Sequence, residues 1–336
     1  MDAMKINNRE IGAGQPCFII AEAGLNHNGD PEIAKQLIKK AADCGADAIK
    51  FQTYTTGELF PPDHPDYKKF EKHVFGEDIY KELIEESNKN NIIFLSTPFD
   101  EASADLLFSL GITAYKVGSG ELTHLQFLKY LARKELPMIL STGMSNMDQV
   151  DKAVQAIQSV GDVPLSMLHC VSAYPCPVKE VNVRRITMLK NRFAAPIGFS
   201  DHTESDTSAL AAVVLGACIV EKHFTLSHHL PGWDHHFSYD PNQLRRFVKA
   251  IREVETSLGE SEKHVTESEV KIEEIARRAI YARIPLKAGY ILTAKNLIVR
   301  RPAGPISADQ FEEVLGKVVL RDIPVGEALR LEDIKE

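Results

Sequence analysis

Polar and ionisable side chains recur at every second position in several β-rich runs of this 336-residue sequence. Successive side chains of a strand point to opposite faces, so each series lies on one face of its strand. Ionisable groups on an inward face are costly to bury unless they are paired or bind a ligand. A buried salt bridge would explain one such run, but five runs with this pattern favour catalysis or binding. The residues are Lys50 with Gln52, Ser200 with His202, Glu221 with His223, and the single residues Glu22 and Lys116.

His202 and His223 form the candidate metal site. Each lies near the end of a β-rich run, and the two runs follow one another along the chain. Neighbouring strands lie about 4.8 Å apart, so two imidazoles at their ends can bind the same ion. Two neutral imidazoles together with oxygen ligands suit a divalent ion such as Mn²⁺.

A second possible histidine cluster lies within residues 219–236, which hold five of the twelve histidines. Four of these come as adjacent pairs in the loop, at positions 228–229 and 235–236. Adjacent loop residues need not face one point, so we expect most of the four to be solvated. Asp234 and His236 are the loop residues that we expect to contact a substrate.

Lys50 and Lys116 form a candidate anion site. Two ammonium groups on an inward face, with hydroxyl donors around them, suit phosphate and carboxylate groups. Each hydroxyl alone is weak evidence, so the prediction depends on their shared position at the ends of β-rich runs. The hydroxyl groups are those of Thr97, Ser119, Ser141 and Ser200.

Eight β-rich runs, alternating with helical patterns, must position these residues. Such alternation predicts a parallel sheet, and eight units predict a (β/α)₈ TIM barrel, whose active site forms at the carboxyl ends of the strands. A doubly wound open sheet is the alternative, but AEAGLNHNGD after the first run is not the glycine-rich phosphate loop that it requires. The runs are residues 17–24, 48–53, 92–99, 114–121, 137–144, 165–174, 196–203 and 218–226.

The chain changes character after the barrel. We assign residues 1–256 to the barrel, the polar and acidic segment 257–275 to a linker, and residues 276–336 to a small, mostly-β domain. This last domain has a slight excess of basic residues within an acidic protein, which suits a site for small anions.

Bulk composition excludes several functions. A net charge of −8 argues against nucleic-acid binding. The N-terminus lacks an apolar signal region, and no stretch of about 18 apolar residues is present, so we expect a cytoplasmic protein without a membrane partner. Five scattered cysteines without a CxxC pair indicate reduced thiols.

Nearly the whole chain resembles the sialic acid synthases. The ordered motifs are AEAGLNHNG, IKFQTY, STPFD, YKVGSGE, LSTGM, HCVSAYPCP, GFSDHT and EKHFT, and RRPAGP resembles part of the family's C-terminal antifreeze-like (SAF) domain. The resemblance implies condensation of phosphoenolpyruvate with an N-acylated hexosamine to a nine-carbon 2-keto acid, with release of phosphate. The sugar would be N-acetylmannosamine for an N-acetylneuraminate synthase, or a 2,4-diacetamido-6-deoxy hexose for a legionaminate or pseudaminate synthase. Mn²⁺, with Mg²⁺ or Co²⁺ as alternatives, and a homodimer are also implied.

The same resemblance implies roles for individual residues. His202 and His223 would be the metal ligands, with Glu221 outside them, and Glu22 would contact substrate and handle a proton. Arg301 would be the SAF-domain arginine that reaches the sugar. Contacts with phosphoenolpyruvate would come from Lys50, Thr97, Lys116, Ser119, Ser141, Ser172 and Ser200, and contacts near the sugar from Gln52, Tyr174 and Asp234. Some members have asparagine where this chain has Ser172, which is a departure from the family's motif.

The C-terminal domain, which contains Arg301, starts far from the predicted active site. Barrel helices run antiparallel to their strands, so the helix ending near Leu258 finishes at the face opposite the site. The linker could extend about 60 Å at most. We predict a domain-swapped homodimer in which Arg301 closes the other subunit's site, with a cap in the same subunit as the alternative.

Two other functions stay open. A Schiff-base aldolase would use Lys50, Lys116 or Lys222 as its nucleophile. The tail alone would suggest a non-catalytic ice- or sugar-binding module, which leaves the ionisable residues inside the barrel without a purpose.

Overall fold

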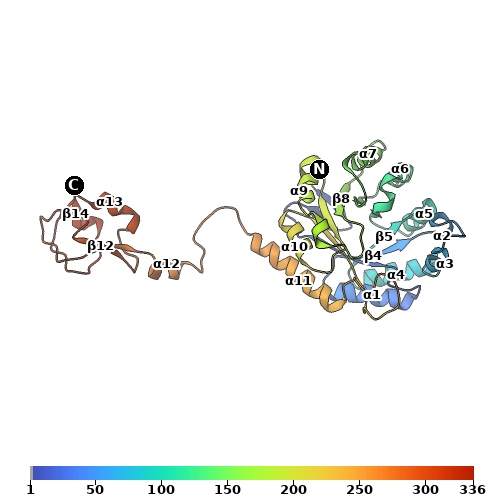
Figure 1. Ribbon diagram of the computed structural model, residues 1–336, viewed down its shortest axis with the longest axis horizontal. Helices are drawn as coiled ribbons and strands as arrows, with labels where there is room; N and C mark the ends of the chain where they lie inside the picture. The colour runs from blue at the N-terminus through green and yellow to red at the C-terminus, as the bar shows by residue number, and fades with distance from the viewer. Residues whose placement is uncertain (1–2) are drawn as a thin grey trace. The chain divides into compact units, whose positions relative to one another are not determined.

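The first part of the chain is a nearly closed barrel. The computed structural model describes residues 3–336 and divides the chain into two compact units, Met1–Gly259 and Glu260–Glu336. In the first unit eight parallel strands neighbour one another in the order β5-β4-β3-β10-β9-β8-β7-β6, and β5 also contacts β6 (Figure 1). The predicted (β/α)₈ fold is therefore confirmed. The strands are β3 (Phe18–Gly24), β4 (Ala48–Thr53), β5 (Ile93–Pro98), β6 (Tyr115–Val117), β7 (Met138–Ser141), β8 (Leu165–Cys170), β9 (Ile197–Asp201) and β10 (Ile219–His223).

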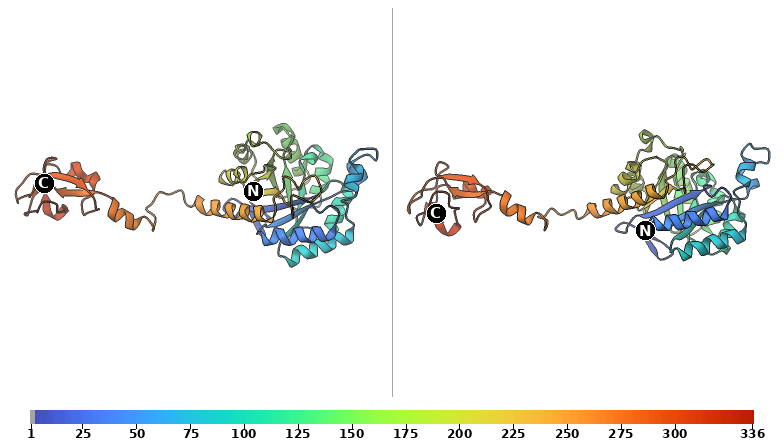
Figure 2. Two further views of the ribbon diagram at one scale, coloured as in Figure 1. Left: turned by 60° about the horizontal axis from the view of Figure 1, so that its bottom comes forward. Right: turned by 90° about the horizontal axis from the view of Figure 1, so that it is seen from below.

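Longer helices surround the strands, each with an apolar stripe toward them. In α1 (Pro31–Asp43), the Asp30 side chain accepts hydrogen bonds from the backbone N–H groups of Glu32 and Ile33, which caps the helix. Helix α11 (Pro241–Leu258) lies beside α1 and α10 (Figure 2). The others are α4 (Glu77–Lys89), α5 (Glu101–Ser109), α6 (Leu125–Ala132), α7 (Met147–Gln158), α9 (Arg185–Arg192) and α10 (Thr207–Val214). Short helices occur in the loops: α2 (Thr56–Leu59), α3 (Tyr67–Glu71), η1 (Ser119–Thr123) and α8 (Val178–Val181).

A hairpin of β1 (Ala3–Ile6) and β2 (Arg9–Gly12) precedes the barrel and is not among the strands that the sequence predicts. Its apolar side chains share one buried cluster with inward-facing residues from the amino-terminal part of the barrel. The hairpin therefore closes the amino end of the barrel and leaves the carboxyl end for the polar residues. The cluster contains Met4, Ile6, Ile11, Phe18, Ile20, Ala48, Leu95, Ala114, Ile139, Leu168 and Ile219.

The second unit has its own hydrophobic core, which includes Ile280, Leu297, Ile306, Val319 and Leu329. Its elements are α12 (Val270–Ala276), β11 (Ala279–Ala282), β12 (Leu297–Arg300), η2 (Ala308–Gln310), α13 (Phe311–Val314), β13 (Val318–Val319), η3 (Leu331–Asp333) and β14 (Ile334–Lys335).

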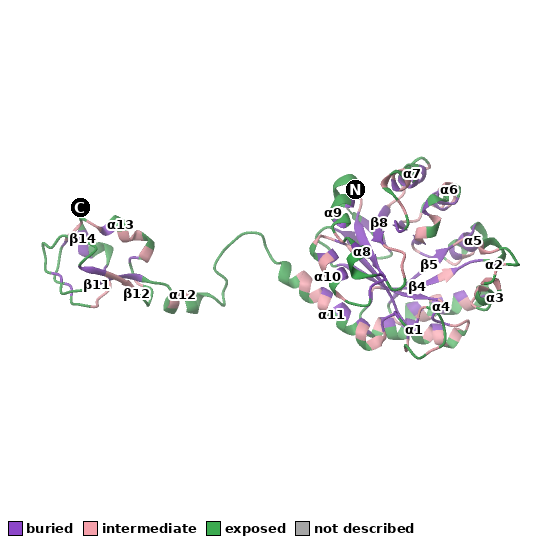
Figure 3. Cartoon of the chain, viewed as in Figure 1, coloured by how far each residue is buried: buried purple, intermediate pink, exposed green. Residues whose placement is uncertain are grey.

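The segment predicted as a linker, residues 257–275, has helical residues at both of its ends. It contains the end of α11 and most of α12, and its residues are almost all exposed (Figure 3). Within residues 3–336, none of the helices has both the length and the hydropathy that a membrane span needs.

Candidate active site

A cavity of about 680 Å³ lies at the carboxyl ends of the barrel strands. Every barrel strand, or the loop that follows it, supplies at least one lining residue, as expected for the active site of a TIM barrel. Fifteen residues singled out from the sequence line it: Glu22, Lys50, Gln52, Thr97, Lys116, Ser119, Ser141, Ser172, Tyr174, Ser200, His202, Glu221, His223, Asp234 and His236. The strand alternation that predicted inward-facing residues therefore brings them together.

Ser119 has other surroundings than the sequence suggested, whereas the outward side of Lys222 follows from its alternation with Glu221 and His223. Ser119 does not end a strand, because β6 stops at Val117 and Ser119 opens the 3₁₀ helix η1. Lys222 does not line the cavity, since it lies on the opposite side of its strand from Glu221 and His223. Arg301 is an exposed residue of the second unit, just after β12.

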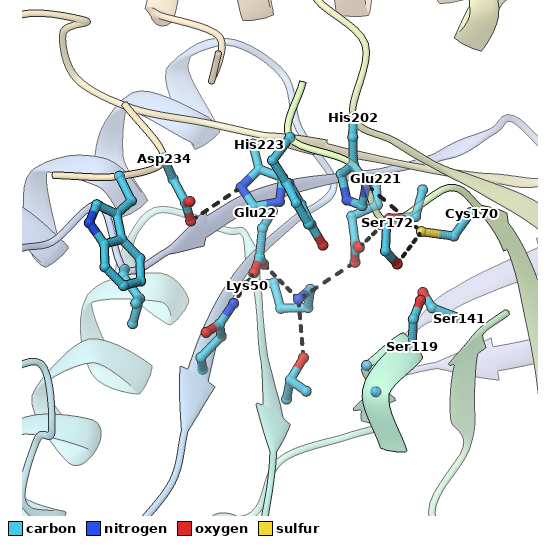
Figure 4. Close-up of a pocket in the computed structure, with 18 of the residues that line it drawn as sticks. Glu22, Lys50, Ser119, Ser141, Cys170, Ser172, His202, Glu221, His223 and Asp234 are labelled. Atoms are coloured by element: carbon cyan, nitrogen blue, oxygen red, sulfur yellow. Dashed lines mark hydrogen bonds and ion pairs between the residues drawn. The ribbon is translucent and has the colours of Figure 1, made fainter. Parts of the chain in front are cut away.

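A buried network of charges occupies the bottom of the cavity (Figure 4). Lys50 Nζ lies 2.7 Å from Glu22 Oε2 and 3.7 Å from Glu221 Oε2, while Lys116 Nζ lies 3.4 Å from Glu221 Oε1. The hydroxyl of Ser200 donates to Glu221 Oε1 at 2.9 Å. Two cations and two carboxylates therefore balance one another, and an incoming anion can compete for the lysines.

Hydroxyl groups extend from both lysines toward the cavity wall. Lys50 donates to Thr97 Oγ1 at 3.1 Å, and Lys116 donates to Ser141 Oγ at 2.8 Å. The hydroxyl of Ser119 accepts from the backbone N–H of Gly143 at 3.0 Å. These cations and hydroxyls form the kind of donor set that binds phosphate or carboxylate.

The two carboxylates of this network differ in acidity. Burial raises the pKa of Glu22 to about 7, although Lys50 opposes this. Burial also tends to raise the pKa of Glu221, but Lys116 and Lys50 outweigh it and lower that pKa to about 2. Burial lowers the pKa of Lys116, whereas at Lys50 the two carboxylates outweigh burial and raise the pKa. Glu221 is thus ionised at neutral pH, whereas Glu22 gains and loses its proton near neutral pH.

His202 and His223 lie side by side above this network, with ring centroids 5.3 Å apart. Nδ1 of His202 donates to the carbonyl of Val171 at 2.7 Å, which leaves Nε2 to act as a ligand. Burial, reinforced by the charge of His202, lowers the pKa of His223 well below its usual value. Nδ1 of His223 is buried and has no hydrogen-bond partner among the described residues, with Asp234 Oδ2 at 3.7 Å.

Loop residues complete the pocket, and the sequence indicated Tyr174 among them but not Trp233 or Phe237. The ring of Tyr174 packs on His202 with centroids 4.2 Å apart, and Phe237 packs on His223 at 5.0 Å. Trp233 and Phe237 also line the cavity. Their positions follow from the path of the loop after β10, for which the sequence has no periodic signal.

Cys170 is a lining residue that sequence reasoning missed although a signal existed. It follows outward-facing His169 at the end of β8, so strand alternation predicts that it points inward. Its Sγ lies 3.9 Å from Nδ1 of His202.

The remaining histidines of the 219–236 segment do not form a metal cluster. His228 and His229 are exposed, and His236 is exposed at the rim of the cavity. His235 is the exception to the expected solvation, because it is buried against Thr225 Oγ1 at 2.6 Å. Within residues 3–336, no three His, Cys, Asp or Glu side chains converge into a complete metal site.

Comparisons with known proteins identify the family of this chain. A model of the NeuB family matches residues 37–263, and a model of the SAF domain matches residues 277–335. The N,N'-diacetyllegionaminic acid synthase of Campylobacter jejuni is 40% identical over 93% of this chain and 98% of its own length. That of Legionella pneumophila is 37% identical over 98% of both chains.

A solved structure shows the same fold. The N-acetylneuraminic acid synthetase of Leptospira borgpetersenii, crystallised with citrate, is 35% identical and superimposes with a TM-score of 0.76, covering 80% of this chain and 94% of that chain. The predicted resemblance to the sialic acid synthases is confirmed. The chain therefore belongs to the NeuB family and has an SAF domain after its barrel.

Proposed function

We propose that this protein condenses phosphoenolpyruvate with an N-acylated hexosamine to a nine-carbon 2-keto sugar acid and releases phosphate. The observation that supports this most is the union, in one buried pocket, of two lysines and several hydroxyls with a pair of histidines. We place N-acetylmannosamine first as the sugar, which makes the protein an N-acetylneuraminate synthase. The alternative is a 2,4-diacetamido-6-deoxy hexose, which makes the protein a legionaminate synthase, as the two bacterial relatives are named, or a pseudaminate synthase.

The upper part of the pocket fits a divalent ion. The orphaned Nδ1 of His223 and the free Nε2 of His202 are both imidazole donors that such an ion binds. We propose that these two histidines hold Mn²⁺, or alternatively Mg²⁺ or Co²⁺, with oxygen atoms of substrate and water completing the shell. When bound, the ion supplies Lewis-acid polarisation of the sugar aldehyde.

The proposed condensation forms one carbon–carbon bond and breaks one carbon–oxygen bond. Carbon 3 of phosphoenolpyruvate forms the new bond to the aldehyde carbon of the open-chain sugar, and the aldehyde oxygen gains a proton. Water adds at carbon 2, where positive charge develops, and phosphate then leaves from carbon 2 by C–O cleavage to give the 2-keto acid.

Residues of this protein hold the substrates in position and supply a proton. Lys50 and Lys116 hold the phosphate and carboxylate in place, chiefly by electrostatics. Glu22 has a pKa of about 7 and is the residue placed to transfer a proton. Gln52 donates to Glu22 Oε1 at 3.2 Å and orients it.

Isotope labelling tests this chemistry. In ¹⁸O-water, we expect the label in the keto acid, because water attacks carbon 2. Label found in the released phosphate would refute C–O cleavage. Phosphate release from a panel of N-acetylmannosamine and 2,4-diacetamido-6-deoxy hexoses identifies the sugar.

A Schiff-base aldolase is the second candidate, and the lowered pKa of Lys116 favours it because a neutral amine is nucleophilic. It predicts that borohydride traps substrate on the lysine and that EDTA has no effect. The proposed synthase predicts the opposite result for both measurements.

We further propose a swapped homodimer in which Arg301 reaches the sugar in the site of the other subunit. The resemblance to the sialic acid synthases supports this, as does the largely exposed segment before β11, which is long enough to cross to another subunit. Contact within one subunit is the alternative.

A further inference from the structure

A buried ion pair lies on the outer face of β9 and β10, behind the two histidines. Lys222 Nζ is 2.9 Å from Asp201 Oδ2, and the two side chains are 1% and 0% exposed. The two residues are register partners across the strands. Asp201 directly precedes His202, and Lys222 directly precedes His223, so the pair joins the residues next to both candidate metal ligands.

The Lys222 side chain binds the residues immediately before and after His202. Besides its bond to Asp201, its ammonium group donates to the carbonyl of Thr203. Asp201 Oδ1 accepts from the backbone N–H of Thr203 at 2.8 Å. The residues on either side of His202 are therefore both bound by one side chain of the neighbouring strand, Asp201 through its carboxylate and Thr203 through its carbonyl.

Tyr239 completes the arrangement on the side of His223. The Lys222 ammonium lies 4.4 Å from the centroid of the Tyr239 ring, and the Tyr239 backbone N–H donates to the carbonyl of His223 at 2.8 Å. The Tyr239 hydroxyl donates to Asp206 Oδ1 at 2.6 Å. The same ammonium group thus links the ends of both strands.

Stability alone is a poor explanation for this pair. The outer face of a barrel strand packs against helices, where apolar side chains serve well, and replacing a buried ion pair by apolar residues is often neutral or stabilising. Lys222 and Asp201 do not line the cavity, so they do not touch a substrate there. The pair therefore acts through the residues beside it.

The ring of His223 needs such support. His202 is oriented by its hydrogen bond to Val171, whereas Nδ1 of His223 has no hydrogen-bond partner among the described residues. Its orientation depends on packing and on the backbone at the end of β10. Metal-binding side chains must be held to about 0.5 Å and 10–20° for productive geometry.

We propose that Lys222 and Asp201 are positioning residues that fix the distance and orientation of His202 and His223 for one shared divalent ion. This rests on the proposed function only in that the two histidines hold the ion. A single neutral substitution leaves a buried charge unpaired and destabilises the barrel, so the test uses Asp201→Asn/Lys222→Met together.

The first measurement is Mn²⁺ affinity by calorimetry. Loss of outer support for metal ligands typically weakens binding 10- to 100-fold, and we expect a loss within about this range for the folded double variant. Phosphoenolpyruvate affinity in EDTA should stay within about threefold, because Lys50 and Lys116 lie on the inner face. Wild-type Mn²⁺ affinity in the folded double variant would overturn the proposal.

The second measurement needs no metal. In protein labelled with ¹⁵N-histidine, the imidazole resonances of His202 and His223 should shift in the double variant, and unchanged resonances would overturn the proposal. If the double variant does not fold, Asp201→Glu decides instead. It keeps the charge pair but moves the carboxylate by one methylene, so unchanged Mn²⁺ affinity and imidazole resonances in Asp201→Glu would likewise overturn the proposal.

A control ion pair, partly exposed, lies at the other end of the barrel. Asp47 Oδ2 and Arg252 Nη2 form an ion pair 3.0 Å long just before β4. Asp47→Asn/Arg252→Met should leave the imidazole resonances and Mn²⁺ affinity unchanged, and a loss equal to that of the test variant would overturn the proposal. If His202→Ala also left Mn²⁺ affinity unchanged, the proposed metal site would fail instead, while the metal-free resonances would still report on positioning.

Discussion

Glu22 and Glu221 are the same residue type with opposite acidities in one pocket. Lys50 contacts both, but Glu221 also has Lys116 and the hydroxyl of Ser200, whereas burial dominates at Glu22. Environment therefore separates a permanently ionised group from one that exchanges a proton near neutrality.

The first prediction at the residue scale concerns the histidines. His202→Ala and His223→Ala should each reduce activity by at least 100-fold and weaken Mn²⁺ binding, because one remaining imidazole holds an exchangeable ion poorly. Steady-state kinetics and calorimetry measure both effects. His228→Ala, at an exposed residue that bonds Gln243 outside the cavity, is the control and should stay within a few-fold. An inactive His228→Ala beside an active His223→Ala would contradict the assignment.

The second prediction concerns the anion site. Lys116→Met removes a charged donor, and such hydrogen bonds contribute roughly 1.5–3 kcal/mol. The KM for phosphoenolpyruvate should rise about 10- to 150-fold, at 1.4 kcal/mol per decade, and turnover should fall. Initial rates over a range of phosphoenolpyruvate concentrations measure this. An unchanged response would assign Lys116 to a structural ion pair with Glu221.

The third prediction concerns pH. The folded-state pKa of Glu22 is about 7, above its ordinary value of 4.5. Between these values the unfolded chain has lost this proton and the folded chain keeps it, so this group lowers stability as pH rises from about 4.5 to 7. The Glu22→Gln variant lacks this ionisable group, so it does not lose this part of the stability as pH rises.

The unfolding free energy of Glu22→Gln relative to wild type should therefore increase from pH 5 to pH 8. The expected change is on the order of 1 kcal/mol or more, since one pKa unit corresponds to about 1.4 kcal/mol. Urea unfolding at both pH values measures it. A constant difference would show that the Glu22 pKa is not raised.

At the scale of elements, the strands separate chemistry from packing by alternation. On β9 and β10, Ser200 and Glu221 face the cavity, while Asp201 and Lys222 face outward. Further down β9, Gly198 lies on the inward side, where the barrel interior leaves no room for a side chain.

Gly198 therefore gives a stability prediction. An added Cβ would lie 2.5 Å from Leu168 Cδ2 and 2.6 Å from the carbonyl oxygen of Ile219. Gly198→Ala should destabilise the barrel by roughly 1–3 kcal/mol through overpacking, measured by urea unfolding. The control is Gly161→Ala, where an added Cβ meets nothing within 4 Å. Equal stability of the two variants would contradict the close approach of the strands.

At the scale of the whole molecule, the prediction concerns the proposed swapped dimer. Glu22→Gln subunits and Arg301→Ala subunits should each be inactive, but mixing them should restore activity. In the swapped heterodimer one site receives both substitutions and the other receives none. With contact inside each subunit, every site keeps one substitution, so no recovery in heterodimers confirmed by mass would exclude the swap.

The fold and most of the pocket could be predicted because they depend on local order. Strand and helix patterns alternate along the chain, and side-chain direction alternates within each strand, so Lys50, Lys116, Ser200, His202 and His223 could be assigned to the inner face. The amino-terminal hairpin escaped prediction because its strands are short. Helix α12 was assigned to a linker because it buries no residue that would mark a helical face.

The sequence by itself determined which residues point into the barrel and the family to which the chain belongs, since both follow from motifs and alternation within single strands. Only the tertiary structure decided that Glu22 pairs with Lys50, that Trp233 and Phe237 enter the pocket, and that Lys222 bonds Asp201 behind the histidines. These contacts join residues far apart in the chain. They depend on the closure of the barrel and on the paths of its loops, which no local pattern encodes.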